Sequence, residues 1–309
     1  MENTKLSRPI SGVGFSATGK YLIIIEQEAM DIFSVFELPE LAYKGGFSKT
    51  GRGPSEFIAL DSRSGEATTD GLKICDVNTG FVFISLKDFS KNKSFTISKI
   101  IKLSGALRPL NDATQINDSI IIGLPYPQSN KLIIDEPFVR YNSNSKKNDY
   151  FGQYPNIYPK TRRSIFWEIF TRGTVVKSDN SKFASFFNQV KMFRIYKTDG
   201  TLEKEQIMKT QDDFFEGEWV RENAISYYSI VKATNNYIFA ICENQHSHDL
   251  LQNKPILEIW DWNGNPIASI QMDRPVSGFD VSDDNKQIYF IDRQTMDNIF
   301  VCDLTQILK

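Results

Sequence analysis

The chain has 309 residues, 40% of them hydrophobic, and its 36 lysine and arginine residues nearly balance its 38 aspartate and glutamate residues. The net charge of -2 argues against a nucleic-acid partner, which needs a strongly basic surface. No apolar run approaches the roughly 20 residues of a membrane-spanning helix, and the start MENTKLSRPISG lacks the basic and apolar regions of a signal peptide. We expect a globular protein with a packed core, no transmembrane segment and no export signal in the chain as given.

Short extended runs recur from one end of the chain to the other. They are rich in Ile, Val, Phe and Tyr, as in YLIIIE, GFVFISL, SIIIGL, YIFAICE and QIYFID, and clusters of Gly, Asn, Asp and Ser separate them. This composition is typical of β-strands joined by tight turns. The sequence therefore predicts an all-β fold.

A tight turn recurs before one strand of each group, six times at intervals of roughly 50 residues, which is the spacing of propeller blades. Each turn has apolar strands on both sides and is interpreted as the hairpin between the first and second strands of a four-stranded blade. The six turns begin at Ala17, Thr69, Asn117, Ser178, Thr234 and Asp283. The first strands then lie near Ile10, Gly65, Ala113, Thr171, Ser226 and Val276.

The last of the six units contains only three strands, at 276–282, 286–292 and 298–304. A closed ring leaves no free strand edge, so we expect the segment before Ile10 to supply the missing outer strand of blade six. The prediction is a single six-bladed β-propeller domain over residues 1–309. The alternative is two β-sandwich domains, which would require a linker and an independent core in each half.

The stretch FSKTGRGPSEFIAL, residues 47–60, is interpreted as a joint between blades. Gly51 and Gly53 permit backbone angles that a side chain forbids, Pro54 fixes its own, Glu56 can accept backbone hydrogen bonds, and Phe57 can be buried between blades. A phosphate-binding loop would need Lys followed by Ser or Thr and then a helix, and neither is present. Anion binding stays open as an alternative, with Arg52 as the residue that faces a ligand.

The joint continues into DGLKICD and then NTGFVFISL, and this order resembles an NHL-type propeller repeat. The residues that carry the match are Gly51, Gly53, Pro54, Glu56, Phe57, Asp76 and Asn78. The joint also resembles that of the TolB-like six-bladed propeller proteins of Bacteroidota, most of them uncharacterised and many predicted to be lipoproteins of the cell envelope. The resemblance implies the periplasm or cell envelope, if a leader has been removed.

The predicted strands place the long connections at 49–64, 125–134, 152–170, 210–225 and 243–254 on one face of the propeller. Long loops on a rigid scaffold commonly carry binding residues. Arginine offers a forked donor to carboxylate or phosphate, and Trp offers a flat surface to sugars or peptides. The candidate ligand-binding residues are Arg52, Arg162, Arg163, Trp167, Trp219, Arg221, His246 and His248. In the alternative reading, the tryptophans are buried to hold the loops and the arginines form a solvated charge cluster.

The only two histidines, His246 and His248, lie at i and i+2 and would point the same way on a strand. Asp249 or Glu243 could complete a metal shell with them, but no third and fourth ligands can be recognised, so we expect a solvated loop and no cofactor. The cysteines Cys75, Cys242 and Cys302 each lie in an apolar run and are interpreted as small buried residues. Trp260 and Trp262 share one strand face and are expected to pack in the core or between blades.

The function predicted from these patterns is a monomeric, non-catalytic propeller that binds a protein, peptide or glycan through its long-loop face. Whether the protein is an enzyme stays open. The alternative is a metal-dependent hydrolase or lyase of the lactonase-like propellers that the chain distantly resembles. Such enzymes draw ligands from inner strands, where Asp280 and Asn111 are the candidates. The acid pairs Asp212 with Asp213 and Asp283 with Asp284 are interpreted as solvated.

Overall fold

The computed structural model describes residues 2–5, 14–17, 19–26, 29–107, 113–125, 135–157, 169–170, 172–209 and 224–308. Within these residues the strands form six four-stranded antiparallel sheets. Five of the sheets consist of strands that follow one another in the chain, which is the meander expected of propeller blades and not the Greek-key order of a sandwich. The alternative of two β-sandwich domains is therefore wrong.

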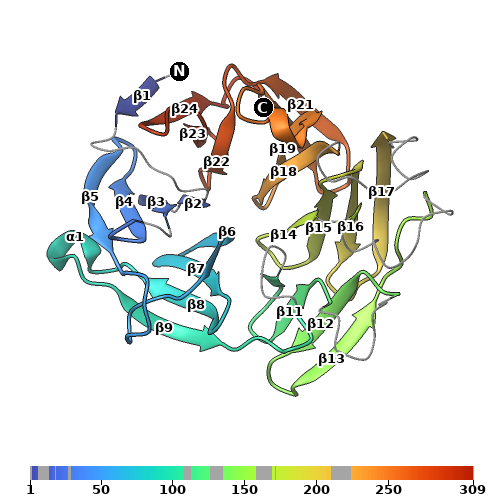
Figure 1. Cartoon of the computed structure of the whole chain (residues 1–309), viewed down its shortest axis with the longest axis horizontal. Helices are drawn as coiled ribbons and strands as arrows, with labels where there is room; N and C mark the ends of the chain where they lie inside the picture. The colour runs from blue at the N-terminus through green and yellow to red at the C-terminus, as the bar shows by residue number, and fades with distance from the viewer. Residues whose placement is uncertain are drawn as a thin grey trace. The chain divides into compact units, whose positions relative to one another are not determined.

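The chain divides into two compact units. Unit 1 comprises Met1–Leu103, Pro109–Asn111 and Val276–Lys309, and unit 2 comprises Ser104–Arg108 and Asp112–Pro275. Figure 1 labels the strands of both units.

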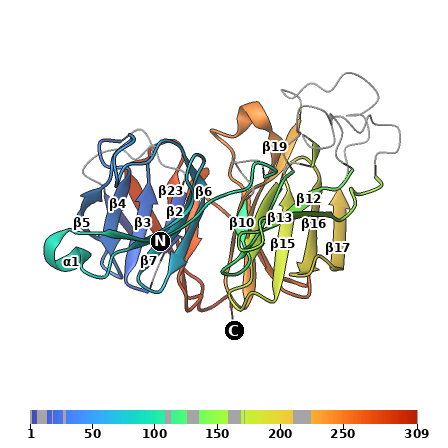
Figure 2. The ribbon, with the colours of Figure 1, turned by 90° about the horizontal axis from the view of Figure 1, so that it is seen from below.

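Unit 1 contains three blades. Blade one is β2 (Gly14–Ala17), β3 (Tyr21–Ile25), β4 (Phe33–Glu37) and β5 (Ala42–Phe47). Blade two is β6 (Leu60–Thr68), β7 (Gly71–Asp76), β8 (Gly80–Ser85) and β9 (Thr96–Ile101), with the short helix α1 (Phe89–Asn92) between its last two strands. Blade six is β22 (Val276–Val281), β23 (Gln287–Asp292), β24 (Asn298–Asp303) and β1 (Glu2–Lys5). Figures 1 and 2 both place α1 beside β5, where the Lys93 ammonium donates to the carbonyl of Lys44.

Unit 2 contains the other three blades. Blade three is β10 (Thr114–Gln115), β11 (Ile120–Gly123), β12 (Phe138–Asn142) and β13 (Lys147–Phe151). Blade four is β14 (Arg172–Val176), β15 (Lys182–Phe187), β16 (Lys191–Lys197) and β17 (Leu202–Lys209). Blade five is β18 (Ile225–Ala233), β19 (Tyr237–His246), β20 (Ile256–Asp261) and β21 (Pro266–Gln271), with a 3-10 helix at Ser247–Asp249 after β19.

The N-terminal strand completes blade six, as the sequence predicts. β1 pairs antiparallel with β24, with Glu2 opposite Val301 and Lys5 opposite Asn298. Figure 1 shows β1 along the outer side of β24. The chain ends are thus joined by a backbone ladder inside unit 1.

Each predicted tight turn joins the first two strands of a sheet, so these turns and the second hairpins share one end of every blade. We call this the tight-turn end. The connections from second to third strand, and from fourth strand to the next blade, leave from the opposite end, which we call the long-loop end. The first strand of blade two begins at Leu60, earlier than the predicted position near Gly65.

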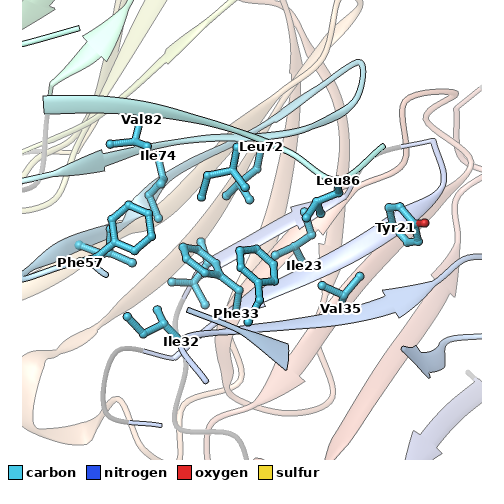
Figure 3. Packing of buried hydrophobic residues seen from close by; sticks show 14 of the residues in the cluster. Tyr21, Ile23, Ile32, Phe33, Val35, Phe57, Leu72, Ile74, Val82 and Leu86 are labelled. Atoms are coloured by element: carbon cyan, nitrogen blue, oxygen red, sulfur yellow. The ribbon is translucent and has the colours of Figure 1, made fainter. Parts of the chain in front are cut away.

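The core of unit 1 lies between neighbouring blades. One cluster joins blades one and two through Ile23, Phe33, Leu72 and Ile74, with Phe57 of the joint packed edge-on to Phe33 at 5.6 Å between ring centroids (Figure 3). A second cluster joins Leu22, Ile24 and Phe36 of blade one to Tyr289, Ile291 and Ile299 of blade six. Burial of each such side chain contributes about 1.5–3 kcal/mol, so the blades hold one another in place.

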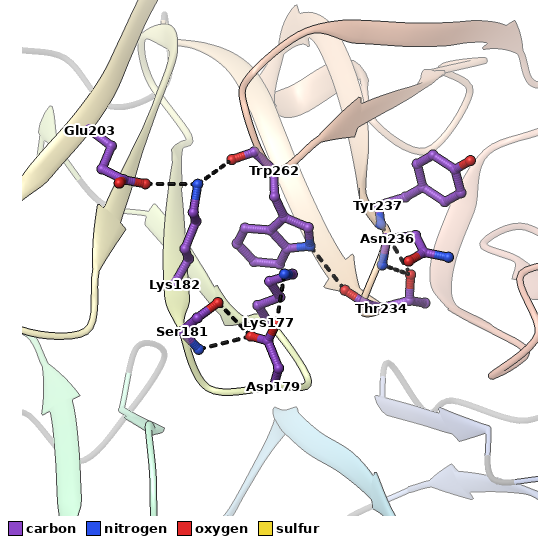
Figure 4. Close-up of polar contacts among 9 residues, drawn as sticks. All are labelled: Lys177, Asp179, Ser181, Lys182, Glu203, Thr234, Asn236, Tyr237 and Trp262. Atoms are coloured by element: carbon purple, nitrogen blue, oxygen red, sulfur yellow. Dashed lines mark hydrogen bonds and ion pairs between the residues drawn. The ribbon is translucent and has the colours of Figure 1, made fainter.

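The core of unit 2 is aromatic. Phe186 and Phe193 of blade four pack against Tyr228 and Trp260 of blade five, and Trp262 lies in the same cluster. At the tight-turn end, the Trp262 indole donates to the Thr234 carbonyl at 3.0 Å, and Lys182 of blade four donates to the Trp262 carbonyl at 3.2 Å (Figure 4). Both tryptophans are buried, as expected from their alternation.

Candidate binding face at the long-loop ends

The joint between blades one and two is a compact hydrogen-bonded loop. The Glu56 carboxylate accepts the Gly53 N–H at 2.7 Å, Gly51 N donates to the Phe57 carbonyl at 3.0 Å, and Phe57 N donates to the Lys49 carbonyl at 3.1 Å. The Phe57 ring is buried, while Arg52, Pro54 and Glu56 are exposed. Arg52 therefore projects to solvent from a loop whose backbone is held on both sides.

The glycines of the joint serve a different purpose from the one expected. Neither Gly51 nor Gly53 adopts a left-handed φ, so the expectation of special backbone angles is wrong. A Cβ on Gly51 would lie 2.0 Å from the Glu56 Oε2, and one on Gly53 would lie 2.9 Å from its Cδ. The glycines make room for the carboxylate that closes the loop.

Asp76, at the end of β7, ties the joint to its blade. Its Oδ2 accepts the N–H groups of Ile58 and Ala59 at 3.1 and 3.3 Å, and its Oδ1 accepts those of Asn78 and Thr79 at 3.0 and 2.8 Å. The carboxylate is fully buried, and four backbone donors offset the cost of its burial.

The first strand of blade two carries a large bulge at its long-loop end. Asp61 pairs with Cys75 and Glu66 with Lys73, so four residues of β6 face one residue of β7. The Ser64 hydroxyl donates to the Asp61 carbonyl at 2.6 Å and accepts the Cys75 N–H at 2.8 Å. Asp61 also accepts the Arg63 N–H at 3.2 Å. The bulge presents the exposed Arg63 side chain on the strand nearest the axis of a propeller.

His246 and His248 come together in unit 2. Their rings stack with centroids 5.5 Å apart and an interplanar angle of 18°, and His248 Nε2 lies 3.3 Å from the Asp249 carboxylate. β19 ends at His246, and His248 lies in the following 3-10 helix, within the connection from β19 to β20. His246 is half-buried and His248 is exposed, and Leu251, later in the same connection, is 62% exposed.

Glu243, near the end of the same strand, is buried, and both oxygens of its carboxylate accept hydrogen bonds from uncharged donors. The Ser229 hydroxyl donates to its Oε1 at 2.8 Å, and the Asn253 amide donates to its Oε2 at 2.9 Å. Asn253 also donates to the Glu243 carbonyl at 2.7 Å, which folds the loop back on β19. No group of three or more His, Cys, Asp and Glu side chains in the described part of the chain is arranged to hold a metal ion.

Asp280, the inner-strand candidate for metal binding, lies in unit 1. Its Oδ2 accepts the Ala17 N–H at 2.8 Å and its Oδ1 accepts the Val281 N–H at 2.9 Å. The side chain therefore joins the first strands of blades six and one. Asn111, the other candidate, lies outside the described residues.

A polar network lies between blades four and five. Lys191 Nζ is 2.8 Å from the Glu258 carboxylate, and the Tyr228 hydroxyl donates to the other Glu258 oxygen at 2.7 Å. Burial, together with the Glu258 charge, raises the pKa of Tyr228. Burial raises the pKa of the neighbouring Cys242 thiol to about 12. Tyr228 and Cys242 are thereby held neutral at physiological pH.

The remaining sequence candidates lie outside the described residues. They are Arg162, Arg163, Trp167, Trp219 and Arg221, together with the acid pair Asp212 and Asp213. The other acid pair, Asp283 and Asp284, is exposed in the hairpin between β22 and β23, as expected. Cys75 and Cys242 are buried, as expected. Cys302 is only half-buried, because it lies on β24 near the edge of blade six, so its predicted burial is wrong.

Met30, Ile58 and Arg63 are exposed residues of the long-loop ends that were not among the candidates. Met30 and Ile58 are 83% and 40% exposed, on the β3–β4 connection and on the joint. Arg63 lies within the predicted connection at 49–64. The polar run SRSG could have indicated an interruption of the strand, but the sequence does not show how the bulge orients the arginine.

Six meandering four-stranded sheets, one completed from the N-terminus, define a six-bladed β-propeller. The family described as TolB-like 6-blade propeller-like matches residues 14–284, and the chain belongs to this family. No curated protein matches the sequence. None of the helices in the described part of the chain has the length and apolarity needed to cross a membrane.

Solved structures with the same fold have little sequence in common with this chain. A DUF4221 protein from Bacteroides vulgatus is 8% identical with a TM-score of 0.56, covering 98% of this chain and 97% of that one. A Bacteroides fragilis protein described as exported is 14% identical with a TM-score of 0.54, covering 94% and 82%. Hydrazine synthase from Kuenenia stuttgartiensis is 11% identical with a TM-score of 0.50, covering 97% and 78%. At these identities the likeness concerns the fold alone.

Proposed function

We propose that this protein is a non-catalytic binding propeller that engages a protein, peptide or glycan through the long-loop ends of its blades. The observation that carries the proposal is the exposure of apolar side chains. Met30 and Leu251, at 83% and 62%, are the two most exposed large apolar side chains of the described residues, and both lie on connections from second to third strand. Connections at the ends of a rigid scaffold are the common place for binding residues, and these exposed side chains are available for contact there.

The charged groups at these ends support binding over catalysis. General acid-base chemistry needs carboxyl groups whose environments separate their pKa values and leave them within reach of a substrate. Glu243 and Asp76 instead accept hydrogen bonds from the protein itself on both carboxylate oxygens. The outward groups include Arg52, Arg63 and His248, which suit recognition of a ligand.

We further propose that the 309 residues act as one monomeric domain, with no cofactor needed for binding. The family and the likeness to a protein described as exported support a location in the periplasm or cell envelope. The neighbour's description is the reason for this part of the proposal, since fold alone does not determine location.

The test is a screen of the purified protein on peptide and glycan arrays, followed by binding measurements with variants. Trp219→Ala with Arg221→Ala, and His246→Ala with His248→Ala, change the long-loop connections of unit 2. Lys147→Ala, at an exposed residue of the tight-turn end, is the matched control. We expect ligands whose binding falls in a long-loop variant and is retained in the control. Ligands that bind all of these variants and the Arg52→Ala variant equally well would place the binding surface elsewhere and defeat the proposal.

A further inference from the structure

Most carboxylates at the long-loop end of unit 1 accept hydrogen bonds from the protein, although Glu56 itself is exposed. Glu56 accepts from Gly53 N, Asp61 from Arg63 N, and Asp292 from Gln294 N at 2.7 Å. Asp76 accepts four N–H groups, and Glu26 is almost fully buried with the Ser34 hydroxyl 3.4 Å from its carboxylate. Asp31 and Asp297 are half-buried, the former beside Gly46. Most carboxylates of this end therefore serve as hydrogen-bond acceptors that fix the loop backbone.

The cations at the same end face solvent. Arg52 projects from the joint and Arg63 from the bulge of β6, and Lys49 is exposed at the start of the joint. Neither arginine forms an ion pair with a carboxylate in the described part of the chain. Because Lys49, Arg52 and Arg63 outnumber the exposed Glu56 and the half-buried Asp31, this end of blades one and two has a positive surface.

Two exposed apolar side chains accompany the arginines. Ile58 follows the buried Phe57 in the joint, and Met30 lies on the β3–β4 connection. This connection is held against the joint, since Ile32 N donates to the Ser48 carbonyl at 3.1 Å. The exposed aromatic side chains of the described residues, Tyr43 and Tyr150, lie instead on the fourth strands β5 and β13.

We propose that the long-loop end of blades one and two binds an acidic peptide segment that also carries an apolar side chain. Arg52 and Arg63 pair with its carboxylates, and Met30 and Ile58 contact the apolar residue. This inference rests on the proposed function and names the ligand class for one part of the long-loop face. A peptide is favoured over a glycan because sugars stack on exposed aromatic rings, and the described residues of this end present apolar side chains without such rings.

The expected strength of recognition follows from the chemistry of the arginine side chain. A guanidinium donates two parallel hydrogen bonds to one carboxylate, and each charge-assisted bond is stronger than a neutral one. Both arginines extend from backbone that is already held by hydrogen bonds. On the protein's side, binding therefore orders only the arginine side chains. Loss of both arginines should weaken binding by at least about tenfold, which corresponds to roughly 1.4 kcal/mol.

The experiment measures fluorescence anisotropy with labelled peptides. The probe consists of Asp-Asp-Leu repeats, and the comparison peptides are Asn-Asn-Leu repeats, which lack the charge, and Asp-Asp-Gly repeats, which lack the apolar side chain. Wild-type protein should bind the probe at least about tenfold more tightly than either comparison peptide. The affinity should also fall with added salt, because exposed charges are screened.

The variants separate charge from apolar contact. Arg52→Gln with Arg63→Gln, and Met30→Ser with Ile58→Ser, should each weaken binding of the probe at least about tenfold. Lys87→Gln with Lys91→Gln removes the same charge at the tight-turn end of blade two and should leave binding unchanged. Melting temperatures equal to wild type show that the variants are folded.

Three outcomes would overturn the inference: no preference for the acidic probe, equal binding by the arginine variant, or equal loss in the lysine control. Polygalacturonate provides the glycan arm. If it competes with the probe and itself binds tightly through Arg52 and Arg63, an acidic glycan replaces the peptide as ligand. If one of these outcomes is found while binding of the array ligands still depends on His246 and His248, this inference is refuted. The broader proposed function is then retained.

Discussion

The Asp280 carboxylate accepts the backbone N–H of Ala17 at 2.8 Å, although 263 residues separate them in the chain. Asp280 lies on β22, the first strand of blade six, and Ala17 ends β2, the first strand of blade one. Ala17 is also buried in the apolar cluster that joins blade one to Tyr289 and Ile291 of β23 and Ile299 of β24. Within unit 1, this bond joins the inner strands of blades six and one. The pairing of β1 with β24 completes blade six at its outer side.

Asp280→Ala should destabilise the protein. Removal of the side chain leaves the part-buried Ala17 N–H without this acceptor, which costs about 1–3 kcal/mol. The measurement is the free energy of unfolding from denaturant titration. Asp283→Ala, at an exposed carboxylate in the adjacent hairpin, is the control and should change stability by no more than about 0.5 kcal/mol. Equal stability of Asp280→Ala and wild type would show that the closing bond is energetically neutral.

Deletion of residues 2–5 should expose the edge of β24. The strand has the sequence ENTK, so its contribution comes from ladder hydrogen bonds more than from apolar burial. We expect a loss of about 2–4 kcal/mol, at about 1 kcal/mol for each ladder bond, and a tendency to aggregate through the free edge. Thermal unfolding and light scattering provide the measurements. A melting temperature equal to that of wild type would mean that blade six is stable with three strands.

The blade pattern could be predicted because turn chemistry is local. Asn, Asp and Gly in the hairpins determine where strands end. The last unit has only three strands, so its fourth strand must come from the N-terminal segment. The bulge of β6 could not be predicted in the same way. Its register depends on Ser64 Oγ taking the place of a backbone acceptor for Cys75 N, which is a contact across two strands. The candidate arginine that it presents was missed for the same reason.

The histidine pair shows a similar limit. Two residues at i and i+2 share a face only while the strand continues. Asn244 adopts a left-handed φ of 48°, the β18–β19 register shifts nearby, and the strand ends at His246. The rings nevertheless stack because the 3-10 helix turns His248 back toward His246. The sequence shows only that the two histidines are close in the chain, whereas the stacking of their rings depends on where the strand ends.

Gly51→Ala should loosen the joint. The new Cβ would lie 2.0 Å from the Glu56 Oε2, so the carboxylate must move away from Gly53 N. We expect a loss of no more than about 1 kcal/mol, measured by denaturant unfolding, because the exposed Glu56 side chain can move and only its bond to Gly53 N is lost. Gly105→Ala is the matched control, because nothing lies within 4 Å of a Cβ at that position. In the Glu56→Ala background the effect of Gly51→Ala should largely disappear, and a fully additive double variant would contradict the steric explanation.

The three cysteines should differ in reactivity. Burial, with help from Asp61 and Asp76, raises the pKa of Cys75 to about 12, and burial raises that of Cys242 to about 12. The thiolate is the reactive form, so both should resist Ellman's reagent in the native protein at about pH 8. The half-buried Cys302 should react first. Cys302→Ser should abolish the native reaction, and rapid labelling of the other two cysteines in that variant would contradict their burial.

Stability should fall steeply in alkali because of Tyr228. Its folded-state pKa lies above the ordinary tyrosine value of 10.0, owing to burial and to Glu258. The unfolded chain ionises this phenol near pH 10 while the folded protein keeps it neutral. The stabilisation is therefore fully present below pH 10.0 and is lost as the pH rises toward the raised folded-state value. A single such group contributes a slope of up to about 1.4 kcal/mol per pH unit.

Tyr228→Phe separates this effect from the hydrogen bond to Glu258. At neutral pH the variant should lose about 1–3 kcal/mol, because the buried Glu258 oxygen loses its phenol donor. Above pH 10 its free energy of unfolding should decline less steeply than that of wild type, since no phenol remains to ionise at this position. Glu258→Gln retains the phenol and its burial, so its alkaline decline should stay steep. Denaturant unfolding across this pH range measures the slopes, and equal slopes for wild type and Tyr228→Phe would show that other groups cause the alkaline loss.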